Sequence, residues 1–259
     1  MSGLDWFALQ LQRAQPPHVI RALSAALLGM ALALVSVCLP KLSVSEETGT
    51  AFVDKIAAAY GGAELLPRLA TMRQTGRTMS AMRGNVEGDM VRQFVYPDKL
   101  RIEIDYVGDV RETRILDGMS GWMDGEPVTG PMLMAMRLQA ARLALPLLLI
   151  SHRNEVIDHG HRRLTDGREI HLLELPLGEH SAISVEVDPE SAMILRSHSL
   201  VALGGAIMEF MTVYSEFNSL DGVLVATREE QYAMGNYVGW TSISRIDFPE
   251  SIAASSFRP

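Results

Sequence analysis

Four histidines and one serine are the residues of this chain whose types and spacing could do chemistry. His159 and His161 stand two apart in "DHGHRR", so on a strand they share one face, and with His171 or His152 they could surround a metal ion. The two arginines that follow would repel a cation, and no carboxylate completes the set at a fixed spacing. We therefore interpret these histidines as solvated strand residues and expect no metal site.

Ser120 is the one candidate nucleophile, in "DGMSGW". Asp-Gly and Ser-Gly are turn signals, and the sequence contains no G-x-S-x-G, H-E-x-x-H, C-x-x-C or glycine-rich phosphate loop. Glu103 and Asp105 share a strand face with Arg101 and are most simply a charged surface. We expect no catalytic residue and no cofactor. An envelope hydrolase built on Ser120 and the histidines stays as the weakest of three hypotheses.

The overall composition excludes one class of partner. A net charge of −8, without a block of Lys or Arg, argues against nucleic-acid binding. The chain has 15 methionines, whose flexible thioethers either line surfaces that accept apolar shapes or fill gaps in a core. Its single cysteine, Cys38, excludes an intrachain disulfide.

An uncharged stretch near the N-terminus, "ALSAALLGMALALVSVCL" (22–39), follows Arg13, His18 and Arg21. A signal peptide has an apolar region of about 7–15 residues and a membrane span needs roughly 17–25, so an uncleaved anchor is favoured and cleavage is the alternative. Either way, the chain from about residue 40 lies outside the cytoplasm. We divide it into a leader and anchor (1–40), a linker (41–50) and one domain (51–259).

The domain reads mainly as strands. In "DKLRIEIDYVG" Leu100, Ile102, Ile104 and Tyr106 alternate with charged residues, a period of two that gives one apolar and one wet face. Turn signals such as Asp-Gly and Pro-Asp separate similar segments as far as "YVGWTSISRIDF", which ends at Phe248. A helix over 51–60 that ends at Gly-Gly precedes them. The pattern predicts an α+β fold, mainly β, with about ten strands in a curved antiparallel sheet whose apolar face is covered.

The stretch "GPMLMAMRLQAARLALPLLLI" (130–150) is the most apolar part of the domain. Two central arginines, Arg137 and Arg142, would each cost roughly 2.5–3.5 kcal/mol in a bilayer, so it is not a second span. We predict a helix over 132–145, ended or kinked by Pro146. Its apolar residues lie on two sides, so it needs the sheet on one side and either more core or a ligand on the other.

The order of segments resembles the LolA/LolB-like family of bacterial envelope proteins, whose fold RseB-type sensor domains share. The resemblance covers roughly residues 51–259, and it rests on a helix that ends in Gly-Gly, a mid-chain helix and these segments: "MRQTGRTMS" (72–80), "FVYPDKLRIEIDY" (94–106), "RILDGMSGWMDG" (114–125), "SVEVDPESAMILR" (184–196), "FNSLDGVLVATR" (217–228) and "IDFPESIAASSFRP" (246–259).

The resemblance implies a half-open antiparallel barrel with an apolar cavity that takes lipid or lipoprotein acyl chains, covered by a helical lid. It implies a bacterial periplasmic protein without enzymatic activity, here tethered to the inner membrane. We expect the cavity to contain Leu100, Ile102, Ile104, Tyr106, Trp122, Phe210 and Trp240, and the lid to contain Met132, Leu133, Met136 and Leu143.

Two departures from the family pattern leave alternatives open. The functional arginine of the carriers matches no residue here, and Arg68, Arg73 and Arg77 are all neighbours of its place. A tethered chain cannot shuttle across the periplasm, so an RseB-like sensor that binds an envelope protein partner is the alternative to a lipid carrier or acceptor.

Overall fold

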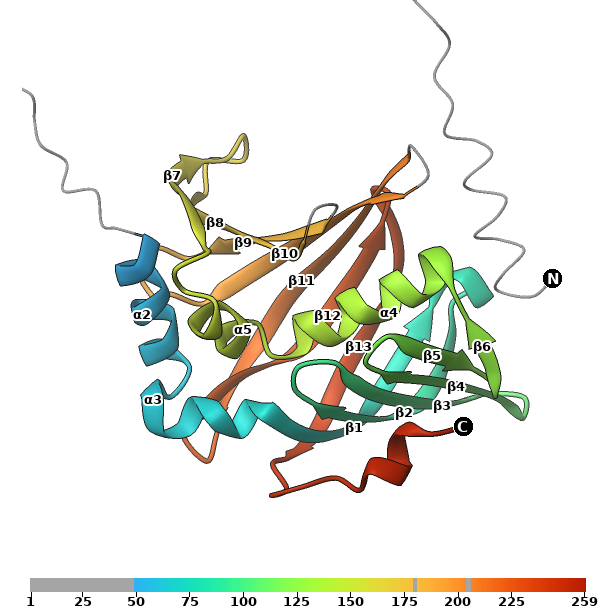
Figure 1. Cartoon of the computed structure of the whole chain (residues 1–259). Coiled ribbons are helices and arrows are strands. Elements are labelled where there is room, and N and C mark those ends of the chain that lie inside the picture. Colours follow the sequence, from blue (N-terminus) through green and yellow to red (C-terminus); the bar gives the residue numbers. More distant parts are fainter. Residues whose placement is uncertain (1–48, 179–180, 204–205) are drawn as a thin grey trace, which may run out of the picture. The chain divides into compact units, whose positions relative to one another are not determined.

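One antiparallel sheet dominates the computed structural model, which describes residues 49–178, 181–203 and 206–259, all within one compact unit. Within these residues thirteen strands follow the order β6-β5-β4-β3-β2-β1-β13-β12-β11-β10-β9-β8-β7. The sheet curves around α4, and its end strands β6 and β7 do not pair (Figure 1). The predicted α+β class with a curved antiparallel half-barrel is confirmed, but the expected number of about ten strands was too low. The predicted anchor (22–39) lies outside the described residues.

Two meanders form the sheet. The first consists of β1 (Thr71–Ser80), β2 (Val86–Val95), β3 (Lys99–Tyr106), β4 (Val110–Asp117), β5 (Ser120–Met123) and β6 (Glu126–Val128). The second consists of β7 (Ile157–Arg163), β8 (Glu169–Pro176), β9 (Ser181–Val187), β10 (Ile194–Leu203), β11 (Ala206–Leu220), β12 (Val223–Ala233) and β13 (Asn236–Asp247). The first and last strands, β1 and β13, pair with each other and join the meanders.

Two of the extra strands lack the alternation that reveals a strand. β1 contains Gly76, and it turns polar Gln74 and Thr78 toward the same face as Met72. β6 is three residues long and contains Pro127. Hydrophobic periodicity could therefore not find either strand, and their assignment depends on pairing with β13 and β5.

The apolar residues of β3 lie on the inner face of the sheet, which is the face that α4 covers. Leu100 is fully buried, and the rest of that row is also buried. The opposite face of β3 and β4 is covered by the C-terminal turn η3 (Ala254–Phe257), where Phe257 is fully buried. Arg101 on that face donates to the backbone carbonyls of Ser256 and Arg258, both at 3.2 Å.

Short helices cover one end of the second meander. α2 (Gly49–Ala59) is followed by Gly61, whose φ of 116° few other residues adopt. α3 (Gly62–Leu65) and η1 (Leu66–Ala70) then lead into β1. The Tyr60 hydroxyl accepts the backbone N–H of Ile194 at 3.0 Å. Phe52 of α2 stacks on His171 of β8, with ring centroids 3.6 Å apart.

The apolar mid-chain stretch forms two helices, α4 (Gly130–Leu143) and α5 (Leu145–Ser151), which meet at 87°. The predicted end at Leu145 was wrong, because α4 stops at Leu143 and Pro146 lies in the first turn of α5, where its missing N–H costs nothing. α4 crosses the inner face from β4 and β5 to β10 (Figure 1). Met136 and Leu138, on opposite sides of α4, are both buried.

Among the described residues, no single helix has the length and apolar character to cross a membrane, and the bent pair α4–α5 meets that criterion by length and composition only.

Candidate functional site

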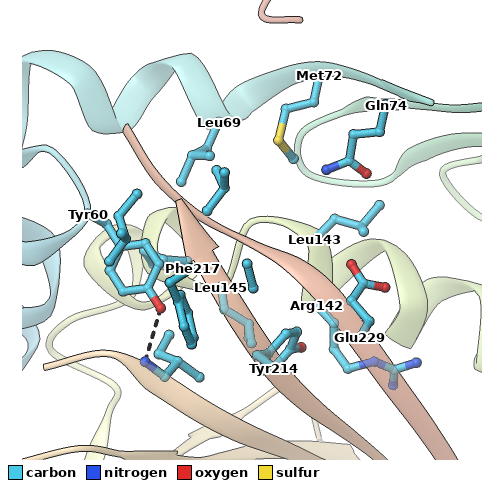
Figure 2. Close-up of a pocket in the computed structure, with 15 residues that line it drawn as sticks. Tyr60, Leu69, Met72, Gln74, Arg142, Leu143, Leu145, Tyr214, Phe217 and Glu229 are labelled. Atoms are coloured by element: carbon cyan, nitrogen blue, oxygen red, sulfur yellow. Dashed lines mark hydrogen bonds between the residues drawn. The ribbon is translucent and has the colours of Figure 1, made fainter. Parts of the chain in front are cut away.

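A cavity of about 60 Å³ lies where α4 and α5 meet the inner face of the sheet. Most of its wall is apolar, and Figure 2 shows Leu69, Leu143, Leu145 and Phe217 around it, contributed by η1, α4, α5 and β11. Its polar lining consists of Tyr60, Gln74, Arg142, Tyr214 and Glu229.

A second cavity of about 20 Å³ lies next to the same segment of α4. It shares Arg142, Leu143, Tyr214 and Glu229 with the first cavity. Its remaining lining residues are all polar: Arg92, Gln139, Thr212 and Gln231. The two cavities therefore form an apolar compartment and a polar compartment that share Arg142 and Leu143 at the end of α4.

Charged side chains of β2, β12 and α4 meet between these compartments. Arg92 is buried and pairs bidentately with Glu229, from Nη2 to Oε1 at 2.6 Å and from Nη1 to Oε2 at 3.1 Å. Its Nε donates to Gln74 Oε1 at 2.6 Å. Arg142 Nη1 donates to Ser199 Oγ at 3.2 Å. We call Gln74, Arg92, Arg142 and Glu229 the central cluster.

Tyr214 lies beside the central cluster on β11. Its hydroxyl shares a hydrogen bond with Ser197 Oγ at 2.9 Å. Burial raises the pKa of Tyr214 to about 12, so the phenol stays protonated at neutral pH. This side chain can donate or accept a hydrogen bond in the cavity, but it carries no charge there.

A second set of two arginines and one glutamate lies on the same face, near β4. Buried Glu112 accepts from Arg83 Nη2 at 2.7 Å and from Arg114 Nε at 2.6 Å, each through a different oxygen. Burial acts to raise the pKa of Glu112, but Arg114 and Arg83 outweigh it, and the pKa lies below its usual value. We call Arg83, Glu112 and Arg114 the edge cluster.

Comparison with solved structures identifies the architecture. A LolA superfamily protein from Nitrosomonas europaea superposes with a TM-score of 0.55 at 12% identity, over 82% of this chain and 98% of that one. This chain has a LolA-like fold. A domain from Vibrio parahaemolyticus that is named for outer membrane lipoprotein sorting gives a TM-score of 0.50 at 11% identity, over 82% and 96%.

The other comparisons add no argument. MucB matches 82% of this chain at 12% identity, with a TM-score of only 0.25. No protein-family model and no curated protein sequence matches the chain. At these identities the likeness establishes the LolA-like fold and says nothing of the ligand.

Of the residues predicted for the cavity and lid, Leu143 lines both compartments. The β3 row is buried on the same inner face, and Leu133 of α4 lies against Gly121 of β5. In α4, Met136 is buried and Met132 is half-buried. Phe210 of β11 lies opposite Ser199 of β10. Their contact with a ligand stays a prediction.

Two predicted tryptophans lie on the other face of this LolA-like sheet. Trp122 pairs with Ile115, and both face outward because the neighbouring pair, Leu116 and Gly121, faces inward. Trp240 precedes inward-facing Thr241, and Arg228 stacks over its ring at 4.3 Å. Side chains alternate between the faces of a strand, so the aromatic character that suggested these residues does not place them in the cavity.

The residues considered for catalysis lie near opposite ends of the sheet. Ser120 is exposed at the start of β5, whereas His159, His161 and His171 lie on β7 and β8. His171 is buried and hydrogen-bonds Asp158 at 2.7 Å. Within the described part of the chain, no group of three or more His, Cys, Asp or Glu residues could hold a metal ion.

Sequence reasoning missed Arg92 as a site residue, although a signal exists. Arg92 follows Met90 and precedes Phe94, so it holds an inward position in an otherwise apolar row. Of the arginines considered instead, Arg68 pairs with Asp221 at 3.1 Å and Arg77 with Glu87 at 2.8 Å. A charged residue at an apolar position of an alternating strand thus indicates a site residue better than the position of an arginine in the family pattern does.

Proposed function

We propose that this chain binds acyl chains of a lipid or lipoprotein in the bacterial envelope, as a carrier or acceptor without enzymatic activity. The observation that carries the proposal is the apolar compartment beneath α4 and α5, on the inner face of an unclosed LolA-like sheet. Burying one methylene group is worth roughly 0.8 kcal/mol, so an acyl chain needs few polar contacts for affinity.

The compartments as they stand are too small for such a ligand. They measure about 60 and 20 Å³, whereas ligand pockets usually enclose about 300–1,000 Å³. We propose that α4 and α5 form the lid and move away from the sheet to admit the ligand. The break between them at Ala144 is where the two helices can change their angle.

The names of the similar structures support the proposal at the level of fold. One belongs to the LolA superfamily and the other is named for outer membrane lipoprotein sorting. A periplasmic location, with residues 22–39 as the membrane anchor, belongs to the same proposal. Cleavage of this segment would give a soluble periplasmic form.

A lipid-uptake measurement tests the proposal. The full chain, purified from membranes, is expected to carry lipid in native mass spectrometry. Met132→Glu places a charge at a half-buried position of α4 and should reduce the lipid-bound fraction at least tenfold, because a carboxylate on the lid opposes the approach of an apolar ligand. Met119→Glu is the matched control, since Met119 is 69% exposed in the turn between β4 and β5.

Equal lipid occupancy in the Met132→Glu and wild-type chains would contradict a role for α4 as lid. A wild-type chain that carries no lipid and takes up none would contradict the whole proposal. If that chain instead crosslinked to an envelope protein, the RseB-like sensor hypothesis would replace it.

A further inference from the structure

The central cluster contains more positive charge than its own carboxylate balances. Both oxygens of Glu229 accept hydrogen bonds from Arg92, and Gln231 adds a longer contact at 3.4 Å. Arg92 uses Nε, Nη1 and Nη2 in its bonds to Gln74 and Glu229. This pair is therefore complete in itself.

Arg142 is the cation that remains. Its hydrogen bond goes to a neutral hydroxyl, Ser199 Oγ, and among the described residues no ion pair within 4.0 Å includes it. Burial lowers the pKa of Arg142, and although Tyr214 and Glu229 act to raise it, Arg92 lowers it further. A guanidinium has five N–H donors in a planar fork, so most of its capacity to bind an oxyanion is unused by Ser199.

The position of Arg142 is as informative as its charge. Arg142 lines both compartments, and Figure 2 shows it beside Leu143 and Glu229, at the side of the cavity away from Tyr60. An apolar tail in the first compartment that ends at the side away from Tyr60 would end next to Arg142. The polar walls of the second compartment, Gln139 and Thr212 among them, offer hydrogen bonds to a headgroup.

We propose that the ligand is an amphiphile whose apolar chain ends in an oxyanion, a carboxylate or a phosphate, which pairs with Arg142. This inference rests on the proposed function, since the acyl chain must first occupy the apolar compartment. An oxyanion supplies the charge that Glu229 does not, and a planar guanidinium binds carboxylate and phosphate oxygens in pairs. A neutral alcohol of equal length would leave Arg142 without a counter-ion.

The test uses three probes that share a twelve-carbon chain: laurate, dodecyl phosphate and dodecanol. Binding is measured below the micelle concentrations, at pH 8, on the full chain held in a lipid-free polymer belt. The wild-type chain should bind laurate, dodecyl phosphate or both at least tenfold more tightly than dodecanol. The anion that binds more tightly identifies the headgroup.

Substitutions on one helix separate charge from structure. Arg142→Met should remove the preference for the anions and leave dodecanol binding within about twofold, because the methionine keeps the apolar wall. Arg137→Met, a half-buried arginine of the same helix, should keep the preference. Ser199→Ala removes the hydrogen bond but keeps the charge, so it should also keep it. Arg142→Gln replaces Arg142→Met if that variant does not fold.

The outcomes distinguish this inference from the proposed function. Equal wild-type affinity for laurate, dodecyl phosphate and dodecanol would overturn the oxyanion site and leave acyl-chain binding intact. An equal loss for all three probes in Arg142→Met would make Arg142 a structural residue and would also overturn the site. Failure of the wild-type chain to bind any of the three would contradict the proposed function itself.

Discussion

The central and edge clusters contain the same charged groups, two arginines and one glutamate, on the same face of the sheet. In the edge cluster each arginine has its own oxygen of Glu112. In the central cluster Arg92 occupies both oxygens of Glu229, and Arg142 is left with a hydroxyl. The two clusters have the same net charge and differ in pairing: both arginines of the edge cluster are bonded to the carboxylate, whereas Arg142 of the central cluster is not.

Removing the shared carboxylate of the edge cluster should have the largest effect. Glu112→Gln leaves Arg83 and Arg114 without their counter-charge beside a buried position, so the free energy of unfolding should fall by about 3 kcal/mol. Urea unfolding at pH 7 measures it. Glu103→Gln, at a more exposed residue paired with Arg101, is the control and should change stability by about 0.5 kcal/mol or less.

The same variant changes the acid dependence of stability. Because the folded-state pKa of Glu112 is lowered, its contribution is present above the unfolded pKa of about 4.3 and is lost as pH falls through the folded value. Urea midpoints of Glu112→Gln should thus change less than those of the wild type below pH 4.5. Parallel curves for the two chains would show that Glu112 is not held ionised by its arginines.

The corresponding change in the central cluster should cost less than Glu112→Gln, because only one arginine is bonded to Glu229. Glu229→Gln should lower the free energy of unfolding by about 2 kcal/mol, because two cations then face each other. Adding Arg142→Met to it should restore about 1 kcal/mol by removing one cation. A double-mutant cycle by urea unfolding gives the coupling, and additive losses would contradict the excess charge.

Removing one arginine from each cluster should have a smaller effect on stability than removing either glutamate. Arg114→Met removes a partner of a buried carboxylate and should cost about 1.5 kcal/mol. Arg142→Met removes a cation without a paired carboxylate and should cost about 0.5 kcal/mol or less in the ligand-free chain. Thermal unfolding of both variants measures the difference in stability. A greater loss of stability in Arg142→Met than in Arg114→Met would show that the charge of Arg142 is already balanced in the ligand-free chain.

A third cluster, on the outer face, has the opposite composition. His198 lies 3.1 Å from Glu186 and 3.4 Å from Glu209, and its hydrogen bond to Glu186 raises its pKa against the opposing effect of burial. Its contribution is therefore complete below the unfolded pKa of about 6.5 and is lost as pH rises through the folded value. Between pH 6 and pH 8 the wild type should lose about 1 kcal/mol.

His198→Gln is the variant that tests this cluster. It should remove most of the stability difference between pH 6 and pH 8, since glutamine does not titrate, and urea unfolding at the two pH values measures it. Arg196 also contacts Glu186, at 3.5 Å, and stays charged over this range, so it cannot supply the pH dependence. An unchanged pH profile in the variant would assign the difference to another group.

The sequence predicts the architecture better than the site, and the reason is physical. Alternation along β3 and turn signals such as Asp221-Gly222 are local, so they identify strands without knowledge of their neighbours. β1 could not be found this way, because its polar inward residues make sense only beside Arg92 and Thr241. The central cluster depends on contacts between strands and α4 that no local pattern encodes.

The pairing of β1 with β13 has a consequence for how the chain folds. Arg73 of β1 lies opposite Asp247 of β13. The first strand in the chain therefore cannot complete its pairing until the last strand has been synthesised. Contacts between distant parts of a chain make folding slow, and the first meander keeps an unpaired edge until then. The edge of β1 therefore stays open to pairing with other strands until residue 247 is available.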